Sequence, residues 1–199
     1  DLVVTSPGIP LDSPLLAESI QAGVPVISEI ELAYRLKPPG VDFLAVTGTN
    51  GKTTTTALIA DILRTSGIPS AAAGNIGIPL TQAIEELAAG MIAVECSSFQ
   101  LETIESFHPR CSGVINITPD HLDRHRTMEN YAEIKSRIFM NQDPDEYTVL
   151  NHMDPWIAKF KPPCRTLYFS ADRVLERGVW IEDGKITASL EGRREVICG

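Results

Sequence analysis

Val46-Thr47-Gly48-Thr49-Asn50-Gly51-Lys52-Thr53-Thr54 is the stretch that decides the fold of this chain. It follows an apolar run, residues 43–46, which we predict to be a buried strand. It precedes residues 55–66, where leucine and isoleucine recur at helical spacing. A strand, a glycine loop with Gly-Lys-Thr and a helix together form the phosphate-binding site of nucleotide-binding proteins. We therefore expect residues 48–54 to bind the phosphates of a nucleoside triphosphate.

The residue types in this loop suit the chemistry of a triphosphate. Gly48 and Gly51 allow backbone N–H groups to turn toward phosphate oxygens, and the helix N-terminus adds the positive end of its dipole. Lys52 would neutralise phosphate charge, and the Thr53 hydroxyl would ligate Mg²⁺. The loop departs from the full pattern at Val46, because a glycine usually stands five positions before Gly51. The alternative interpretation is a glycine turn with a surface lysine.

The composition is that of an ordinary globular protein. The chain has 199 residues, of which 43% are hydrophobic and 22% charged. Its formal net charge of −9 at pH 7 argues against a nucleic-acid partner, since no basic stripe is available to neutralise phosphates. The 4 cysteines form no C-x-x-C pair, so we expect free thiols in a reducing cytoplasm. No apolar run approaches the roughly 20 residues that span a membrane and no signal peptide opens the chain, so we expect a cytoplasmic protein without a membrane partner. We expect a monomer, although the sequence carries no signal of the oligomeric state.

The order of the predicted elements indicates an α/β fold with a P-loop-type, mostly parallel sheet flanked by helices. We predict strands at 43–47, 69–73, 91–96, 112–117, 147–150 and 165–169. We predict helices at 52–66, 79–88, 99–105, 128–140 and 154–160. Residues 179–187 form a hairpin signature, because Asp183-Gly184 supplies the positive φ angles of a tight turn.

The chain divides into two predicted domains. Residues 1–37 are expected to be the tail of a Rossmann-like first domain, with strands at 2–5 and 24–27 and helices at 15–21 and 29–37. Residues 38–41 contain Pro38-Pro39-Gly40 and are predicted to be a linker. Residues 42–199 are predicted to be the central nucleotide-binding domain. Because the chain begins within a strand and without methionine, we expect a fragment.

Two further loops at the carboxyl ends of predicted strands carry residues that could do chemistry, since ligands of open α/β sheets bind there. Glu95 ends the strand at 91–96 and could bind Mg²⁺; the alternative is a surface glutamate or a helix cap. His121 follows the strand at 112–117 and lies between Asp120 and Asp123. This spacing is compatible with a metal or phosphate role for His121 and equally with a structural histidine.

Lys135 is an anomaly on the predicted helix at 128–140. It lies on the inward stripe that Tyr131 and Ile138 mark. A buried ammonium must find an anion or lose its charge, and the alternative is a side chain that snorkels to the surface. Asn75, in the turn after the strand at 69–73, could offer its amide to a substrate, although the turn alone is a weak signal.

Taken in order, these segments resemble the Mur ligases, the ATP-dependent amino-acid-adding enzymes of peptidoglycan synthesis. Residues 48–54 are similar to the shortened phosphate loop of that family, which accounts for Val46. Residues 116–125, Asn-Ile-Thr-Pro-Asp-His-Leu-Asp-Arg-His, and the following 128–131, Met-Glu-Asn-Tyr, are similar to a second family signature. Ser6-Pro7-Gly8-Ile9 and residues 95–102, Glu-Cys-Ser-Ser-Phe-Gln-Leu-Glu, resemble the member of the family that adds D-glutamate. The resemblance covers essentially the whole chain. Arg126 departs from it, since relatives often have glycine there.

The resemblance implies roles at the nucleotide site. Lys52, Thr53 and the loop amides would hold the phosphates of ATP. Thr53 and Glu95 would bind one Mg²⁺, and His121 would help to bind a second. Lys135 matches a position that carries a carbamate formed with CO₂, and this modification would turn the cation into an anionic ligand for the second magnesium.

The resemblance also implies substrates. Asn75 and Ser97 match contacts to the muramoyl-alanine part of UDP-N-acetylmuramoyl-L-alanine, and Ser6 matches a contact in a uridine-nucleotide-binding first domain. The alanine carboxylate would be converted into an acyl phosphate, which the amine of D-glutamate would then attack to form an amide. We expect adenine and D-glutamate contacts beyond Gly199, and therefore little ligase activity from this chain alone.

Other functions stay open at this stage. Sister Mur ligases and the folate polyglutamate ligase share the phosphate loop and parts of the metal site, although Ser97-Ser98-Phe99-Gln100 argues against both. A P-loop phosphotransferase or NTPase would release ADP without needing an acceptor amine. A non-catalytic nucleotide-binding module is the third possibility.

Overall fold

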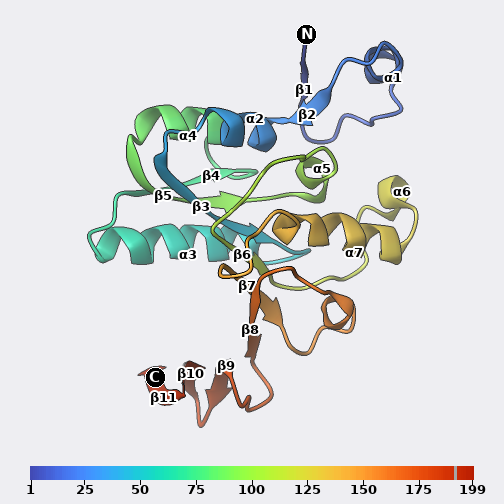
Figure 1. The fold of residues 1–199 in the computed structure, drawn as a ribbon. Coiled ribbons are helices and arrows are strands. Elements are labelled where there is room, and N and C mark those ends of the chain that lie inside the picture. Colours follow the sequence, from blue (N-terminus) through green and yellow to red (C-terminus); the bar gives the residue numbers. More distant parts are fainter. Residues whose placement is uncertain (191) are drawn as a thin grey trace.

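A nine-stranded sheet organises the part of the chain that the computed structural model describes, residues 1–190 and 192–199 (Figure 1). The strand order is β11-β10-β9-β8-β7-β6-β3-β5-β4. Neighbouring strands from β4 to β9 run parallel, while β10 runs antiparallel to β9 and β11. The strands are β3 (Gly40–Thr47), β4 (Ser70–Gly74), β5 (Ala89–Glu95), β6 (Cys111–Val114), β7 (Tyr147–Asn151), β8 (Arg165–Ser170), β9 (Gly178–Glu182), β10 (Lys185–Leu190) and β11 (Arg193–Cys198). The predicted α/β fold with a mostly parallel sheet is confirmed.

Helices cover both faces of the sheet. Figure 1 shows α2 and α4 on one side of β3, β4 and β5, and α3 and α7 on the other. The helices are α1 (Pro14–Gln21), α2 (Glu29–Leu36), α3 (Lys52–Thr65), α4 (Leu80–Glu86), α5 (Ser98–Leu101), α6 (Leu122–His125) and α7 (Met128–Ser136). Because both faces are covered, the centre of β5 is apolar without alternation, and Ile92, Ala93 and Val94 are fully buried.

The N-terminal segment has its own small sheet. The strands β1 (Val3–Thr5) and β2 (Val26–Ser28) pair in parallel. In contrast, α2 packs against the main core, where its residues Ile30 and Ala33 are fully buried. The predicted linker at 38–41 is wrong in its second half, because Gly40 and the buried Val41 already pair with β5. The division into two domains stays a prediction.

The predicted helix at 99–105 is shorter in the structure, where α5 ends at Leu101. The amides of residues 105–107 donate instead to the buried carboxylate of Glu31, at 2.8 to 3.1 Å. Burial by itself raises the pKa of Glu31, but the Ser106 hydroxyl, the amides and Arg35 outweigh it and lower the pKa overall. A carboxylate distant in the sequence therefore ends the helix early.

Two other predicted elements differ from the structure. The helix at 128–140 tightens after α7 into a 3-10 turn, η1 (Arg137–Phe139). The helix at 154–160 is only a 3-10 turn, η2 (Ile157–Lys159), because the Asp154 carboxylate accepts the amide hydrogens of Trp156 and Ile157 and competes with a regular helix.

The predicted hairpin is confirmed. β9 and β10 pair antiparallel, and both turn residues, Asp183 and Gly184, have positive φ angles of 51° and 73°. The predicted strand at 112–117 ends earlier, since β6 stops at Val114 and the chain then turns toward the phosphate loop.

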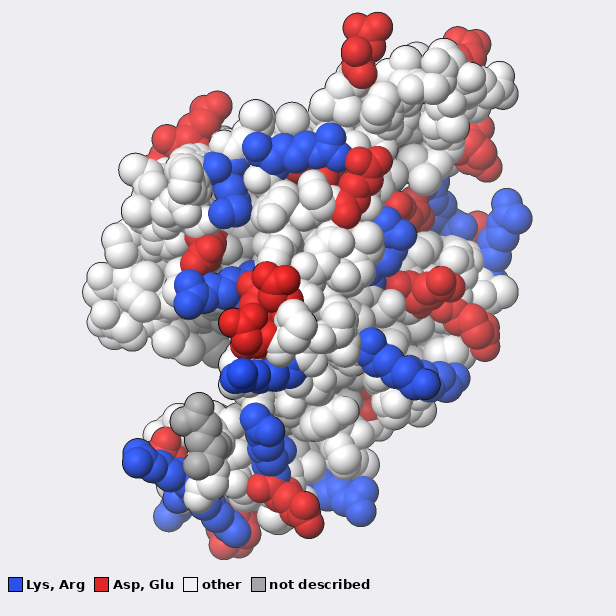
Figure 2. Space-filling view, in the orientation of Figure 1, with Lys and Arg blue, Asp and Glu red and all other residues white. Residues whose placement is uncertain are grey.

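The surface is mixed in charge. On the face that Figure 2 draws, Lys and Arg side chains are interspersed with Asp and Glu side chains. Among the described residues, no helix is long and apolar enough to cross a membrane. The cysteines Cys96, Cys111, Cys164 and Cys198 are free.

Candidate functional site

The phosphate loop connects β3 to α3 at the carboxyl end of the sheet. Gly51 caps α3 in the left-handed conformation, with φ of 84°, which glycine adopts without strain. Gly48 has φ of 151°, and a Cβ there would meet the Asn116 carbonyl oxygen at 3.2 Å. Both glycines predicted to shape the loop are therefore required by its backbone.

Asn116 holds the loop in shape from the neighbouring strand end. Its backbone carbonyl accepts the Thr49 amide at 2.9 Å, and its side-chain Oδ1 accepts the Asn50 amide, also at 2.9 Å. Its Nδ2 donates to the Asn50 carbonyl at 3.0 Å. Sequence reasoning included Asn116 in a family signature without giving it a role. The available signal was a polar side chain near the carboxyl end of the strand predicted at 112–117.

A second set of contacts anchors the buried Thr49. Its hydroxyl lies 3.1 Å from the Thr118 carbonyl and 3.3 Å from the Tyr131 hydroxyl. Lys52 curls back, and its Nζ donates to the Thr49 carbonyl at 2.9 Å. Lys52 is thus positioned on the loop itself, where a phosphate could compete for its hydrogens.

Glu95 lies at the carboxyl end of β5, with 2% of its surface exposed. Its Oε2 accepts the Thr53 hydroxyl at 2.8 Å, and its Oε1 accepts the Asn75 amide at 2.9 Å. Gly74 allows the end of β4 to lie this close to Glu95, because a Cβ at residue 74 would lie 2.5 Å from the Glu95 carbonyl oxygen. A carboxylate and a hydroxyl beside a phosphate loop are the hard oxygen ligands that Mg²⁺ prefers, so these residues fit that ion.

Lys135 is buried, with 1% of its surface exposed, so the snorkelling alternative is wrong. Its Nζ donates to the Gly48 carbonyl at 2.8 Å and lies 3.4 Å from the Thr47 hydroxyl. No carboxylate among the described residues forms an ion pair with it. Burial, with a smaller contribution from Lys52, lowers the pKa of Lys135 to about 7. In a large fraction of the molecules, Lys135 is therefore a neutral amine near neutral pH.

His121 stands at the N-terminus of α6, with its side chain half-exposed. Its φ of 49° is uncommon for a residue other than glycine. The imidazole lies 5.0 Å from the Phe99 ring between centroids, and its Nε2 is 3.4 Å from a carboxylate oxygen of Asp120. The ring is thereby accessible and held beside the cleft.

Five of the predicted residues, Lys52, Asn75, Ser97, His121 and Lys135, line one small cleft of about 120 Å³, whereas Thr53 and Glu95 are not among its lining residues. Its lining comes from the phosphate loop, the β4 and β5 ends, α5, the start of α6 and α7, and consists of Lys52, Asn75, Ser97, Ser98, Phe99, Asp120, His121, Tyr131 and Lys135. Ser97 also caps α5, since its hydroxyl accepts the Gln100 amide at 3.2 Å. Ser6 lies outside this cleft, in a pocket of about 400 Å³ that Asn75 also lines. Asn75 is therefore common to both hollows.

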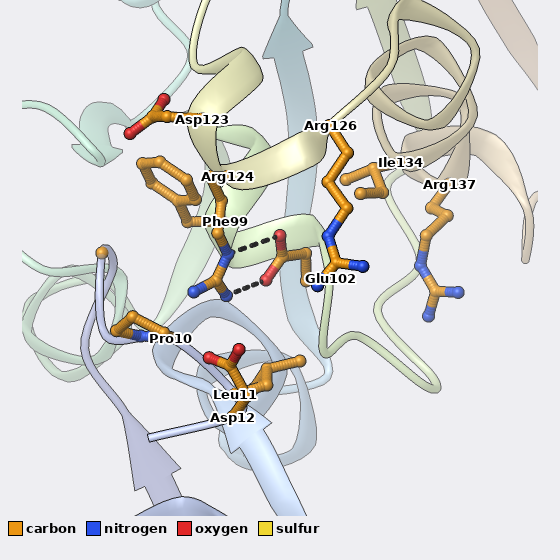
Figure 3. Close-up of a pocket in the computed structure, with 11 residues that line it drawn as sticks. Pro10, Leu11, Asp12, Phe99, Glu102, Asp123, Arg124, Arg126, Ile134 and Arg137 are labelled. Carbon is orange, nitrogen blue, oxygen red and sulfur yellow. Dashed lines mark hydrogen bonds and ion pairs between the residues drawn. The ribbon is translucent and has the colours of Figure 1, made fainter.

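A larger groove of about 660 Å³ lies between the segment 8–12 and the helices α5 to α7 (Figure 3). Figure 3 shows Arg124 paired in a bidentate way with Glu102, at 2.5 and 3.3 Å. The guanidinium groups of Arg126 and Arg137 lie on the other side of Glu102. Phe99 lines both this groove and the cleft. Sequence reasoning did not single out the groove.

Another cluster of possible metal ligands, His108, Asp143 and Glu146, lies at the opposite end of the strands, just before β7. The Glu146 carboxylate is already engaged, with His108 Nε2 at 2.6 Å and the Asp143 amide at 2.8 Å. These contacts give the cluster a structural role in closing the loop before β7.

Comparison with known proteins places this geometry in context. Residues 46–196 match the family model of the Mur ligase middle domain. The chain is 50% identical over 200 residues to UDP-N-acetylmuramoylalanine–D-glutamate ligase of Thermoanaerobacter pseudethanolicus, covering 99% of this chain and 44% of that protein. It is 41% identical to the ligase of the same name from Clostridioides difficile, covering 97% of this chain and 43% of the relative. The chain thus spans less than half the length of these relatives.

Solved structures agree in fold. A UDP-N-acetylmuramate:L-alanyl-gamma-D-glutamyl-meso-diaminopimelate ligase from Neisseria meningitides superposes with a TM-score of 0.66 at 17% identity, covering 98% of this chain and 66% of that one. A MurF ligase from Thermotoga maritima, solved with ADP, gives a TM-score of 0.61 at 18% identity, covering 92% of this chain and 51% of that one. At such identities the likeness establishes the fold alone.

Proposed function

The chain belongs to the Mur ligase family, and from this premise we propose that it forms the ATP-binding part of a ligase that joins D-glutamate to UDP-N-acetylmuramoyl-L-alanine. The proposal is supported by relatives that carry the name of this ligase and are 41% to 50% identical over nearly the whole chain. Since those relatives are more than twice as long, the complete reaction is assigned to a protein of their length that carries this chain. Residues 1–37 would then belong to the uridine-nucleotide-binding domain, with Ser6 as a substrate contact.

The observation that carries the reaction class is the single cleft shared by Lys52, His121, Lys135, Asn75 and Ser97. The loop amides and Lys52 would hold the triphosphate on one side. Asn75 and Ser97 would hold the muramoyl-alanine part on the other. With these roles, the arrangement would bring a substrate carboxylate and a γ-phosphate together in a small volume, which favours attack of one on the other.

The reaction would proceed in two steps. A carboxylate oxygen of the alanine forms a bond to the γ-phosphorus, and the bond from that phosphorus to ADP breaks, which yields an acyl phosphate. The amine of D-glutamate then attacks the acyl carbon, loses a proton and expels inorganic phosphate. During the first step Lys52 neutralises charge that develops on the phosphate oxygens, and a fixed cation stabilises such a transition state more effectively than water does.

Magnesium would be held by oxygen ligands together with the imidazole nitrogen of His121. Thr53 and Glu95 suit one ion, and His121 with a modified Lys135 would suit a second. When bound, the ions would supply charge neutralisation at the phosphates and the acyl oxygen.

Lys135 would serve as a carbamate. The protonated side chain first loses one proton, and the resulting neutral amine forms a bond to the carbon of CO₂ and releases a second proton, which yields an anion with two oxygen ligands. The pKa of about 7 supports this proposal, because only the unprotonated amine has the lone pair that reacts. As a carbamate, Lys135 would also no longer be a buried cation that lacks an anionic partner.

The experiment that tests the function measures amide product with a full-length protein that carries this chain, ATP, Mg²⁺, the nucleotide-sugar substrate and an amino acid. We expect ADP release that requires both acceptors, with D-glutamate preferred over a diamino acid. Release of ADP without any amino acid would identify a phosphotransferase or NTPase instead. Preference for a diamino acid would assign the chain to a sister ligase.

A further inference from the structure

His125, the last residue of α6, is a buried histidine that the proposed reaction does not use. One per cent of its surface is exposed, and its ring packs against two aromatic rings. The centroid distances are 5.5 Å to Phe99 and 5.1 Å to Tyr131. Both neighbours line the catalytic cleft, so His125 lies directly behind its wall.

The two ring nitrogens of His125 face different partners. Nε2 lies 2.9 Å from the hydroxyl of Ser98, which is itself 2% exposed. Nδ1 lies 3.4 Å from Oε1 of Glu102. Nδ1 makes no hydrogen bond among the described residues, so Glu102 favours a proton on Nδ1 through its charge alone, and Nε2 then accepts the Ser98 hydrogen.

The imidazole is held in its neutral form. Burial lowers the pKa of His125, and the positive charges of Arg124 and of unmodified Lys135 act in the same direction, whereas Glu102 opposes them. Arg124 restrains Glu102 through the bidentate pair on the floor of the larger groove (Figure 3).

The contacts of His125 connect the two walls of the cleft. Ser98 begins α5, directly after Ser97 and close to the end of β5. On the other side, Tyr131 reaches the hydroxyl of Thr49 in the phosphate loop at 3.3 Å, and its ring centroid lies 4.8 Å from Lys135 Nζ. A single side chain thus touches the wall that carries Ser97 and the wall that carries Lys135.

We infer that His125 is a positioning residue, which holds the α5 wall and the α7 wall of the cleft at a fixed separation through its hydrogen bond to Ser98 and its packing on Tyr131. This inference rests on the proposed function for its catalytic consequence. A misplacement of reacting groups by about 1 Å can cost about 100-fold in rate. The residue would therefore affect turnover more than nucleotide binding.

The test compares two substitutions. His125→Phe keeps a ring between Phe99 and Tyr131 but removes the acceptor for Ser98. His125→Gln can restore a polar atom near the position of Nε2. In a full-length protein that carries this chain, we expect His125→Phe to lower kcat about 10- to 100-fold with a change in the KM for ATP below about threefold. His125→Gln should recover most of the loss.

A second measurement does not depend on activity. Amide hydrogen exchange of residues 100–102 reports on α5, and we expect it to become about fivefold faster in His125→Phe, as for the loss of one hydrogen bond. The matched control is His152→Phe, at an exposed histidine that packs on Tyr168 far along the sheet. It should change neither kcat nor exchange at residues 100–102.

The outcomes distinguish failure of the positioning role of His125 from failure of the proposed ligase function. Unchanged exchange and unchanged kcat in His125→Phe would overturn the positioning role. Faster exchange with normal kcat in His125→Phe would show that the hydrogen bond to Ser98 does not matter for turnover. Equal loss of kcat in His125→Phe and His125→Gln would contradict a role for the hydrogen bond and leave His125 with a packing role only. If the wild-type full-length protein forms no amide, the proposed function fails, and the exchange measurement then decides alone whether His125 holds α5.

Discussion

Lys135 should react with CO₂ far more readily than an ordinary lysine. Its pKa of about 7 means that about half of the Lys135 side chains are neutral amines at pH 7. A lysine with the usual pKa of about 10.5 has about 3 neutral amines in 10,000 at that pH. Burial therefore raises the fraction of Lys135 present as the reactive neutral amine by about 1,000-fold. A carbamate should consequently form at Lys135 and not at exposed lysines.

The assay is ¹³C NMR of the chain in ¹³C-labelled bicarbonate, with and without Mg²⁺. We expect one carbamate signal from the wild-type chain at pH 8, which weakens as the pH falls through about 7 because the amine becomes protonated. The signal should disappear in Lys135→Ala. It should persist in Lys161→Ala, the matched control at an exposed lysine.

Two results would refute the reasoning. A carbamate signal of equal size in Lys135→Ala would place the modification on another amine. A folded wild-type chain without any signal at pH 8 would mean that the buried cleft excludes CO₂ or that Lys135 keeps its proton.

Three further predictions concern stability. Gly74→Ala should destabilise the chain by at least about 2 kcal/mol in urea unfolding, because φ is +102° and the new Cβ would lie 2.5 Å from the Glu95 carbonyl oxygen. Gly77→Ala, with φ of +63° and open space, should cost only about 1 kcal/mol, and equal costs would contradict the clash. Glu31→Gln should cost about 2–4 kcal/mol at pH 7. Because hydrogen bonds lower the pKa of Glu31, this cost should shrink as the pH falls below about 4.5, and a constant cost in a pH series of urea melts would count against it. Lys135→Met should stabilise the chain by about 1–3 kcal/mol at pH 7 in CO₂-free buffer, since protonation of the unfolded lysine below about pH 10.5 opposes folding. The gain should narrow as the pH rises toward 10, and a gain independent of pH in thermal melts would exclude the charge as its cause.

Local patterns predicted the parallel sheet, the phosphate loop and the hairpin, because each depends on a few adjacent residues. Gly48 and Gly51 were recognisable as required glycines from the motif alone, and their positive φ angles confirm it. Helical spacing also placed Lys135 on the buried face of α7 before any packing was known. The exact ends of α5 and η2 were beyond such patterns, since Glu31 and Asp154 set them through contacts to backbone amides.

The sequence by itself therefore determined the class of fold, the phosphate loop and the residue types of the proposed metal site, because backbone periodicity and glycine conformations act over short distances. Tertiary structure alone decided which strand ends meet. It brought Asn116 to the phosphate loop, Glu95 to Thr53, and His125 between the rings behind the cleft. Such contacts join residues that are far apart in the sequence: Ser98 and His125 are 27 positions apart, and Asn50 and Asn116 are 66 positions apart. They form because the covered sheet forces the carboxyl ends of its strands together and leaves polar side chains there to satisfy one another.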